Sequence, residues 1–560
     1  MPLRRSSCVS RRFLIVAACQ LLTLASAQTA PNPAVVQREQ ATRPAAPTGG
    51  VLKLRLPSEP DVVTEALPVL QLEGVRLLGN KVITIAEIQP LIDTILGRKV
   101  SYAELRKVTS EIEALYRRQG YLLCRAVLPE QEIKDGVISL VIVEGYVSES
   151  QVASEAAPKA LAGQLERYVS PILAQRPLRA DLIERQLLLA EDISGISLES
   201  VLSKGTILGS SRLTVSAETR AREVTFGADN YLQRSLGEGR VFLDVRLNEF
   251  EDAVRQWYFS ASAALPKPEM LTFYAAGLRQ PLGDDGWMMT LGVLRADTLT
   301  RPTDIGGGNT GRVDGASTSL TASLVYPLVR SRQFSVFASA TVESQDSSSW
   351  LDSSAGTTTL VSRDGLRLLR LKAEAVRAAP GSSTVASVQA TASLTRSASA
   401  SSSNPSAPSD FSHYRLSVVD RRLLPADLLL TTRVEGVWAK DSLPVPEQFA
   451  VGGATLVRSF RSASAYGDRG LGAALDLATQ PVAYGIAPFV FGDYAVTPVR
   501  PDQRLPAFRF LRRRASQRSL RHRPPADLRG RAAIPWRNDQ SPAATGGASV
   551  NYFASLQARF

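Results

Sequence analysis

The feature that most constrains the fold is a change of periodicity near residue 222. From there to the C-terminus helical periodicity disappears, and runs of about ten residues alternate between apolar and polar side chains, as in membrane-spanning strands. Between 240 and 248 one face is apolar: Val241, Leu243, Val245 and Leu247. Apart from Phe242, the residues between them are polar or charged. One such face meets lipid and the other meets water, so residues 221–560 are expected to form a membrane β-barrel.

Further runs of this kind are expected as strands of the same barrel: 257–265, 271–282, 287–296, 316–326, 334–342, 366–376, 384–394, 414–423, 428–437 and 470–478. The last run, 550–560, ends in Phe560, and a terminal phenylalanine is typical of outer-membrane barrels. About 340 residues, at roughly 20 for each strand and its connection, give an antiparallel barrel of about 16 strands. A soluble β-sandwich or β-helix also has alternating strands, but long polar loops in an exported chain favour the barrel.

The N-terminus has the order of a secretory signal peptide, which we assign to residues 1–27. Four arginines precede an apolar run at 13–24 and the small residues 25–27, which predicts cleavage before Gln28. A lipoprotein site ending at Cys19 would leave an apolar run shorter than signal peptides use, so this alternative is disfavoured. After residue 27 no stretch approaches the roughly 20 apolar residues of a membrane helix, so a membrane-inserted chain must cross as a barrel.

Two small α/β units are expected between a leader and the barrel, because the order β-α-α-β-β occurs twice. In the first unit, 68–147, Ser101 and Glu104 form a capping box and Gly120 ends the helix that it opens. Its expected elements are a strand at 70–77, helices at 85–95 and 101–119, and strands at 121–128 and 137–143. The second unit, 148–220, repeats the order with helices at 161–173 and 178–193 and strands at 197–203 and 212–217.

The leader, 28–67, is rich in Pro, Ala, Thr and Gln and cannot bury a core. We expect it to be extended, with a short helix around 34–41.

The net charge of +12 does not indicate nucleic-acid binding once it is located along the chain. Residues 500–537 contain twelve arginines and only Asp502 and Asp527, a net charge of +10. Subtracting this segment and the four arginines of the signal peptide leaves −2 for the rest of the chain. An electrostatic attraction of the whole molecule to nucleic acid or to a membrane surface is therefore not expected.

Chemistry-bearing residues are sparse. The mature chain keeps one cysteine, Cys124, which is expected to be a small buried apolar residue and not a nucleophile. The histidines, His413 and His522, have no cysteines or carboxylates at metal-ligand spacing near them. The three glycines at 306–308 precede neither a helix nor a Lys-Ser/Thr pair, so they are a loop and not a phosphate cradle. We expect no catalytic residue, cofactor or metal, and no enzymatic activity.

Two motifs late in the chain resemble those of a known family. Gly452-Gly453 is followed by Val457-Arg458-Ser459-Phe460 and by Gly467-Asp468-Arg469-Gly470, and a second motif reads Phe491-Gly492-Asp493. This order resembles the two-partner secretion transporters of the haemolysin-activator (TpsB) type, in the superfamily of the BamA-like assembly barrels. In that family Val-Arg-Gly-Phe or Val-Arg-Gly-Tyr lies on an extracellular loop that folds back into the barrel, and Phe-x-Asp lies on the inner wall. The resemblance implies that Arg458 and Asp493 are partners.

Elementary electrostatics supports this pairing independently. A guanidinium facing a carboxylate in a narrow lumen makes a charge-assisted, often bidentate bond that fixes the position of a loop. Removing either partner would free the loop and leave the other charge unpaired. The alternative is that Arg458 is an ordinary loop arginine and Asp493 a solvated lumen residue. The order of both motifs, after two α/β units and within a strand-rich region, favours the pairing.

The resemblance also implies a function. It makes the α/β units periplasmic POTRA domains, whose sheet edges accept an exported polypeptide as an added strand, and it makes the leader a plug helix and linker. The expected partner is a large secreted exoprotein of adhesin or haemolysin type, moved across the Gram-negative outer membrane. The barrel would contact outer-membrane lipid and depend on the outer-membrane assembly machinery, with no nucleic-acid partner.

Two alternatives remain for the function: a factor that assembles other barrels, and a passive porin-like channel. Assembly factors generally carry more POTRA units and lack the leader. A channel leaves both units and the two motifs unexplained.

Two departures from the family pattern affect these expectations. Ser459 stands where the family has glycine, which would restrict the loop tip if that position needs a positive φ. Residues 500–537, where the family has two strands, show no clean alternation, and Pro524-Pro525 opposes a ladder. A lipid-facing arginine there would cost roughly 2 to 4 kcal/mol. We consider either a compensated pair of frameshifts or a real basic loop with shortened strands, with barrel closure and activity in question in the second case.

Overall fold

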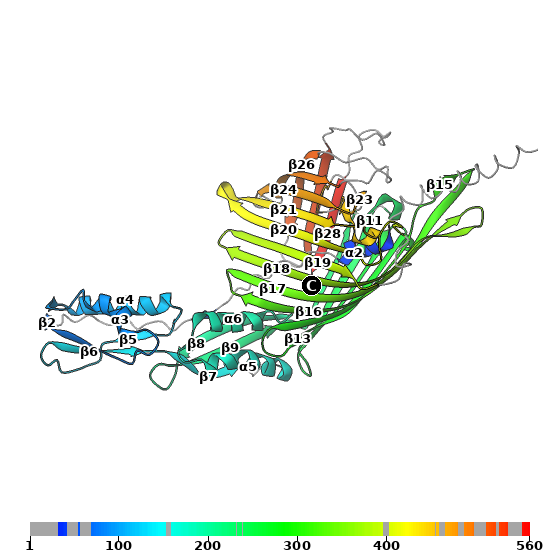
Figure 1. Ribbon diagram of the computed structural model, residues 1–560. Helices are drawn as coiled ribbons and strands as arrows, with labels where there is room; N and C mark the ends of the chain where they lie inside the picture. The colour runs from blue at the N-terminus through cyan, green and yellow to red at the C-terminus, as the bar shows by residue number, and fades with distance from the viewer. Residues whose placement is uncertain are drawn as a thin grey trace, which may run out of the picture.

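The computed structural model describes residues 32–41, 54–55, 69–152, 158–230, 232–237, 239–395, 403–453, 455–458, 465–479, 487–497, 511–521, 526–535 and 552–559. Two α/β units lie in a row to one side of a large β-barrel (Figure 1). The signal peptide expected at 1–27 and the terminal Phe560 lie outside the described residues.

The barrel is one antiparallel sheet that closes by pairing of its first and last strands, β10 and β28. β14 and β15 pair one after the other with β16, so the described strands fill sixteen positions around the barrel, as expected from the sequence. Its strands are β10 (Arg222–Asp229), β11 (Gly239–Glu249), β12 (Arg255–Leu265), β13 (Leu271–Leu282), β14 (Trp287–Leu299), β15 (Thr303–Gly306), β16 (Asn309–Arg330), β17 (Phe334–Ser353), β18 (Thr358–Ala379), β19 (Ser382–Ser393), β20 (Ser412–Leu424), β21 (Leu428–Ala439), β24 (Gly470–Thr479), β25 (Ala487–Val496), β26 (Leu511–Arg521), β27 (Ala526–Pro535) and β28 (Tyr552–Arg559).

The alternating pattern places side chains as expected. On β11, Leu243 and Leu247 are each 41% exposed on the outer face, whereas Phe242 and Asn248 are buried inside. Successive strand residues point to opposite faces, so each barrel strand has one lipid-facing and one lumen-facing row. The barrel therefore follows from the sequence period.

Three neighbouring strands are longer than predicted. β16, β17 and β18 contain 22, 20 and 22 residues, about twice the length that crosses a bilayer. Figure 1 shows their hairpins extending beyond the neighbouring strands at the end of the barrel away from the α/β units. The sequence interpretation missed these extensions because apolar residues become sparse there, while cross-strand pairing continues.

The basic segment at 500–537 differs from the loop that we considered. The backbone of β26 pairs with β25 and that of β27 pairs with β28, so both strands take part in barrel closure. Of the two alternatives considered, the basic loop with shortened strands is contradicted at 511–521 and 526–535, which are strands of 11 and 10 residues. Pro524-Pro525, which we expected to oppose the ladder, falls between the two strands and outside the described residues.

The first α/β unit contains two small sheets and two helices. Ser101 caps α4: its hydroxyl accepts from the backbone N–H of Glu104, and a Glu104 carboxylate oxygen accepts from the backbone N–H of Ser101. The predicted capping box is thus confirmed. The single strand predicted at 70–77 is two strands, β2 and β3, and the sequence interpretation missed β4, which pairs with β2. Its elements are β2 (Leu70–Leu72), β3 (Gly74–Leu78), α3 (Ile85–Ile92), β4 (Arg98–Val100), α4 (Tyr102–Arg118), β5 (Arg125–Val127) and β6 (Val137–Val143).

The second unit has a four-stranded sheet in the order β1-β8-β9-β7. Its elements are β7 (Tyr146–Val152), α5 (Lys159–Ala174), α6 (Ala180–Glu191), β8 (Ile196–Lys204) and β9 (Ser210–Thr219). The edge strand β1 (Leu54–Arg55) belongs to the leader and runs parallel to β8. The leader thus contributes a strand to a domain that begins about 90 residues later in the sequence, which no local pattern could predict.

The second unit is joined to the barrel by apolar and polar contacts. Phe250 and Val254, in the turn after β11, are buried in the core of this unit. On the other side, Arg330 at the end of β16 makes two hydrogen bonds of 2.8 Å to the carboxylate of Asp192, just after α6. Arg185 of α6 donates to the backbone carbonyl of Pro327. These contacts hold the unit against the barrel end that carries the short turns.

The helix α2 (Pro33–Ala41) confirms the short helix expected in the leader and lies inside the barrel. Figure 1 shows it, in dark blue, among the barrel strands and far from the α/β units. Val36 packs in a cluster with Leu236 and Leu271 at the wall. A Cβ on Gly315 of β16 would lie 3.1 Å from the ring of Pro33, so the helix contacts the wall closely there.

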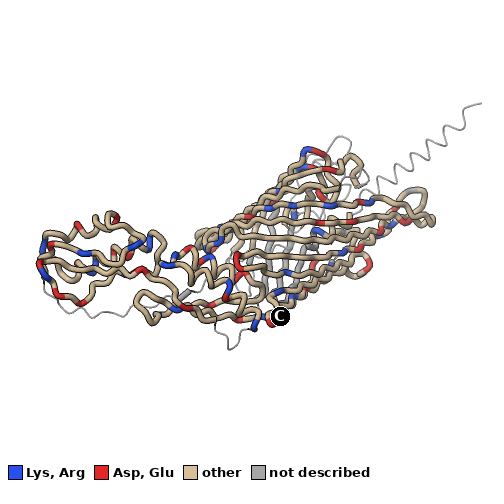
Figure 2. Tube along the Cα trace, turned by 60° about the horizontal axis from the view of Figure 1, so that its bottom comes forward, with Lys and Arg blue, Asp and Glu red and all other residues tan. Residues whose placement is uncertain are grey.

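Three further features concern the surface charge, the cysteine and the possibility of a membrane helix. Figure 2 shows Lys and Arg interspersed with Asp and Glu along both α/β units. Cys124 is buried in the core of the first unit, as expected, and burial raises its pKa to about 11. In the part of the chain that the structure describes, no helix is long and apolar enough to cross a membrane.

Candidate functional site

The candidate site lies where the connection between β21 and β24 meets the helix α2. We call the described part of this connection, residues 440–453, 455–458 and 465–469, the inner loop. It contains the single turn η4 (Val445–Glu447) and a two-stranded sheet of β22 (Phe449–Val451) and β23 (Ala465–Gly467). Its apolar residues Phe449, Leu456 and Val457 are buried against wall residues such as Leu368. The loop therefore folds back into the barrel and does not project outward.

The structure brings together Arg458 and Asp493, the two residues that the sequence motifs pair. The backbone N–H and Nε of Arg458 each donate to Oδ2 of Asp493 at 2.9 Å, and Nη2 donates to Oδ1 at 2.5 Å. The Asp493 side chain is 2% exposed and that of Arg458 is 9% exposed. Water is thus largely excluded, which strengthens the attraction and makes loss of either partner costly.

Two more wall residues complete this contact. Nη2 of Arg458 also donates to Oδ1 of Asp476 on β24, and the guanidinium carbon lies 4.1 Å from the centre of the Phe491 ring. Phe491 and Asp493 are two residues apart on β25, so both point to the lumen, and Asp476 lies directly opposite Phe491. Asp476 was missed because a single aspartate on an alternating strand has no sequence signature.

The backbone at the loop tip is in an uncommon conformation. Val457 has φ +50°, in the left-handed region that β-branched residues rarely adopt. Such a residue costs on the order of 1–3 kcal/mol and persists when its surroundings hold it. The hydrogen bonds from the neighbouring Arg458 to Asp493 can hold the backbone of Val457 in this conformation. Ser459 and Phe460, also in the motif, lie outside the described residues.

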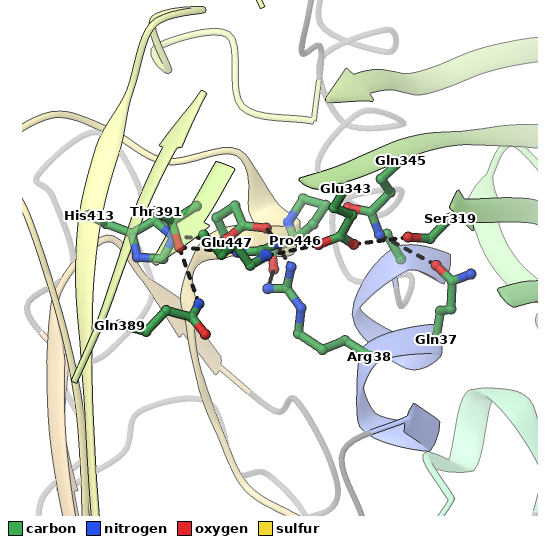
Figure 3. A network of polar contacts seen from close by, with 12 residues as sticks. Gln37, Arg38, Ser319, Glu343, Gln345, Gln389, Thr391, His413, Pro446 and Glu447 are labelled. Atoms are coloured by element: carbon green, nitrogen blue, oxygen red, sulfur yellow. Dashed lines mark hydrogen bonds and ion pairs between the residues drawn. The ribbon is translucent and has the colours of Figure 1, made fainter. Parts of the chain in front are cut away.

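A second polar network, centred on Glu447, joins three parts of the molecule (Figure 3). The Glu447 side chain is fully buried. Arg370 of β18 donates to its two carboxylate oxygens at 2.9 and 3.0 Å, and Nε2 of His413 on β20 lies 2.8 Å from Oε2. Arg38 of α2 donates to Oε1 of Glu447 and to the backbone carbonyl of Pro446. One carboxylate of the inner loop thus binds both the wall and the helix.

The network extends along the wall on either side. Nε of Arg370 donates to Glu343 at 2.8 Å, and Glu343 accepts from the hydroxyl of Ser319. Gln37, next to Arg38, accepts a 2.8 Å hydrogen bond from the hydroxyl of Ser317. These partners come from β16, β17 and β18, so α2 and the inner loop are held by one stretch of wall.

The sequence interpretation missed this network entirely. Glu447 lies between prolines and a buried strand, and nothing in its neighbourhood marks it as a partner of Arg38, which is 409 residues away. The one usable signal was an isolated histidine, His413, at an alternating position on a strand. Among the described residues no group of three or more His, Cys, Asp and Glu side chains is placed to hold a metal ion.

The molecule has the features of an outer-membrane barrel with periplasmic POTRA domains: a closed antiparallel barrel, two α/β units at one end, and a loop folded back onto the inner wall. The family model of the ShlB-type POTRA domain matches residues 70–145. The model of the haemolysin secretion/activation proteins ShlB/FhaC/HecB matches residues 209–498, about half of the chain. The chain belongs to this family of transporters and is not an enzyme.

Individual relatives are distant. Over 273 residues the chain is 24% identical to the heme/hemopexin transporter protein HuxB of Haemophilus influenzae, covering 47% of this chain and 46% of HuxB. It is 26% identical over 222 residues to the outer membrane transporter CdiB of Escherichia coli, covering 39% and 37% of the two chains. The chain thus spans less than half the length of these curated relatives.

Solved structures are similar over the whole chain. CdiB from Escherichia coli has a TM-score of 0.70 at 18% identity, and CdiB from Acinetobacter baumannii has 0.61 at 14%, each with both chains fully covered. At these identities the similarity establishes the fold. The predicted fold class, POTRA domains followed by a large antiparallel barrel, is confirmed.

Proposed function

We propose that the chain exports one large secreted partner polypeptide from the periplasm to the cell surface through the barrel lumen. The observation that carries this proposal is that α2 and the inner loop meet at Glu447 inside a closed barrel. Both are connected to the wall by side-chain contacts and not by strand pairing, so each can leave without breaking the barrel ladder. Together they form a removable plug. A path wide enough for a polypeptide must be closed at rest and therefore needs such a plug, whereas a narrow permanent pore does not.

The periplasmic units supply the entry. The edge of β8 already pairs with the leader strand β1, so this edge accepts an extended segment in parallel register. Main-chain pairing of this kind binds polypeptides with little demand on their sequence. Binding in the periplasm and passage through the lumen are then separate steps.

We assign the motif residues to the resting state. Val457 and Arg458 contact the wall, and Phe491 and Asp493 form their seat. Ser459 and Phe460 are assigned to the same docking role as the other members of the motif. We assign one part of the proposed export to each domain. The leader, to residue 67, supplies the plug helix; the POTRA units, 68–147 and 148–220, bind the partner; and the barrel, from 221, forms the path. Phe560 is assigned as the C-terminal signature residue of the barrel.

The partner class follows from the family and the relatives. The family name refers to haemolysin secretion; HuxB is named a heme/hemopexin transporter and CdiB an outer membrane transporter. We propose an exoprotein of adhesin or haemolysin type, encoded beside this chain.

The test is a secretion assay. The chain is expressed with the neighbouring exoprotein in an outer-membrane host, and extracellular exoprotein is quantified for wild type, Arg458→Ala, Asp493→Ala and Asp441→Ala. Asp441 is exposed in the same loop and is the control for a lost carboxylate. Export by wild type and Asp441→Ala, with loss in the other two while the barrel still assembles, supports the proposal. Insertion of wild type without any export contradicts it and reopens the passive channel, whereas assembly defects in other barrels would indicate an assembly factor.

A further inference from the structure

The sequence motif Gly467-Asp468-Arg469-Gly470 lies at the base of the inner loop and has no role in the contacts described so far. Its last residue, Gly470, is the first residue of β24. A Cβ on Gly467 would lie 1.8 Å from the hydroxyl oxygen of Thr497, and a Cβ on Gly470 would lie 2.1 Å from the Phe449 ring. Both glycines allow close approach of neighbouring groups, so Asp468 and Arg469 sit in a tightly packed frame.

Asp468 binds both ends of the turn that carries Glu447. Its Oδ1 accepts from the backbone N–H of Leu443 at 2.9 Å and from Nε2 of Gln448 at 2.9 Å. Leu443 and Gln448 flank the turn η4, and both are buried. The same amide nitrogen of Gln448 also donates to the carbonyl of Leu443 at 3.2 Å, which closes the turn on itself.

The turn between these two points is short and stiff. Pro444 and Pro446 fix two of its φ angles, and the backbone N–H of Glu447 donates to the carbonyl of Pro444 at 2.9 Å. A stiff segment held at both ends presents its side chains in one orientation. The side chain presented here is that of Glu447, with Pro446 supplying the second acceptor for Arg38.

Arg469 attaches the same frame to the barrel. Its guanidinium donates to the backbone carbonyl of Ala439 at 2.6 Å and to that of Lys440 at 3.1 Å, where β21 ends. Its own carbonyl accepts from the hydroxyl of Thr497, just after β25. These contacts of Arg469 therefore fix the neighbouring Asp468 relative to the ends of two barrel strands, β21 and β25.

We propose that Asp468 is a positioning residue, which holds the turn so that Glu447 reaches Arg38 and the wall at once. This inference rests on the proposed function, because it assigns to Asp468 control over how firmly the plug helix α2 is retained. Asp468 does not touch α2 in any described contact. It acts through Glu447.

The test measures departure of α2 from the wall directly, without secretion. Val36, which is 2% exposed, is replaced by cysteine in the full chain, and its reaction with a maleimide-polyethylene glycol is followed in outer-membrane vesicles. Without this substitution the chain gives the background from Cys124. The rate is then compared among Asp468→Ala, Asp468→Asn, Glu447→Gln, the double variant Glu447→Gln/Asp468→Ala, and Asp441→Ala as the matched control.

We expect Asp468→Ala to raise the labelling rate by about tenfold, as for loss of hydrogen bonds to a charged acceptor. Asp468→Asn keeps an acceptor at Oδ1 and should label more slowly than Asp468→Ala, while Asp441→Ala should match wild type. Because Asp468 acts through Glu447, the double variant should label no faster than Glu447→Gln alone. Heat-modifiable migration of each variant checks that the barrel has folded.

Three results overturn the inference. If Glu447→Gln speeds labelling but Asp468→Ala does not, or if Asp468→Ala adds its full factor on the Glu447→Gln background, Asp468 does not position Glu447 and the proposed plug remains. If Glu447→Gln labels at the wild-type rate, both the positioning role and the plug contact at Glu447 fall together.

Discussion

Loss of the Asp493 carboxylate should release the tip of the inner loop from the wall. Asp493 accepts three hydrogen bonds from Arg458, and its side chain is 2% exposed. Removing one partner of a buried pair costs roughly 3 to 5 kcal/mol, because the other charge stays buried. Asp476 still accepts one bond from Arg458, so we expect the lower end, about 3 kcal/mol, for Asp493→Ala.

This cost converts into a population that can be measured. About 3 kcal/mol corresponds to roughly a 100-fold rise in the undocked fraction of the loop. Asp476 accepts a single bond and is 31% exposed, so Asp476→Ala should raise that fraction only about fivefold, as for one weaker hydrogen bond. The two aspartates lie on neighbouring strands, which makes them a matched pair.

Proteolysis at the cell surface measures the undocked fraction. Proteinase K is added to intact cells, and the rate of cleavage within the inner loop is followed for each variant. When opening and closing are fast relative to cleavage, this rate follows the open population. The double variant Arg458→Ala/Asp493→Ala leaves no buried unpaired charge, so it should cleave more slowly than the two single effects combined would give. Cleavage of Asp493→Ala within twofold of Asp441→Ala would refute the reasoning.

Three further predictions concern the periplasmic units. Arg330→Ala removes both hydrogen bonds to Asp192 and should weaken docking of the second unit by about 2 kcal/mol, seen as faster hydrogen exchange in α6; unchanged exchange would contradict it. Cys124→Ser places a hydroxyl in the core of the first unit and should destabilise it by about 1–3 kcal/mol in urea unfolding, whereas the wild-type thiol, with its pKa raised to about 11, should not react with Ellman's reagent at pH 8. Hydrogen bonds from Thr84 and Ser101 lower the pKa values of Glu87 and Glu104. The stability that these two carboxylates contribute is therefore complete above the ordinary carboxyl pKa and is lost as the pH falls through the lowered values. Protection factors at the N-termini of α3 and α4, taken relative to the intrinsic exchange rate at each pH, should therefore fall on acidification in wild type, and fall less in Glu87→Gln/Glu104→Gln.

The sequence determined the barrel and the first contact of the site because each has a local pattern. Alternation marks strands such as β11, and two short motifs place Arg458 and Asp493. The Glu447 network has no such pattern: Arg38, Glu447, Arg370 and His413 lie far apart in sequence and meet only after the barrel closes. The pairing of β1 with β8 was missed for the same reason. Burial of one carboxylate between two arginines and a histidine is a tertiary fact, which propensity and period do not contain.

The length of β16, β17 and β18 determines how far their hairpins extend beyond the outer membrane. Twenty-two residues at about 3.3 Å each, tilted by about 45°, rise about 50 Å, whereas the hydrocarbon layer is about 30 Å thick. About 20 Å of these hairpins therefore lies outside the hydrocarbon layer, among the headgroups and in the water beyond them. The turn at 354–357, between β17 and β18, is at the far end of this extension and is separated from the inner loop by many residues of paired strand. An antibody epitope inserted at this turn would report that the barrel has reached the surface of living cells, independently of whether the plug is in place.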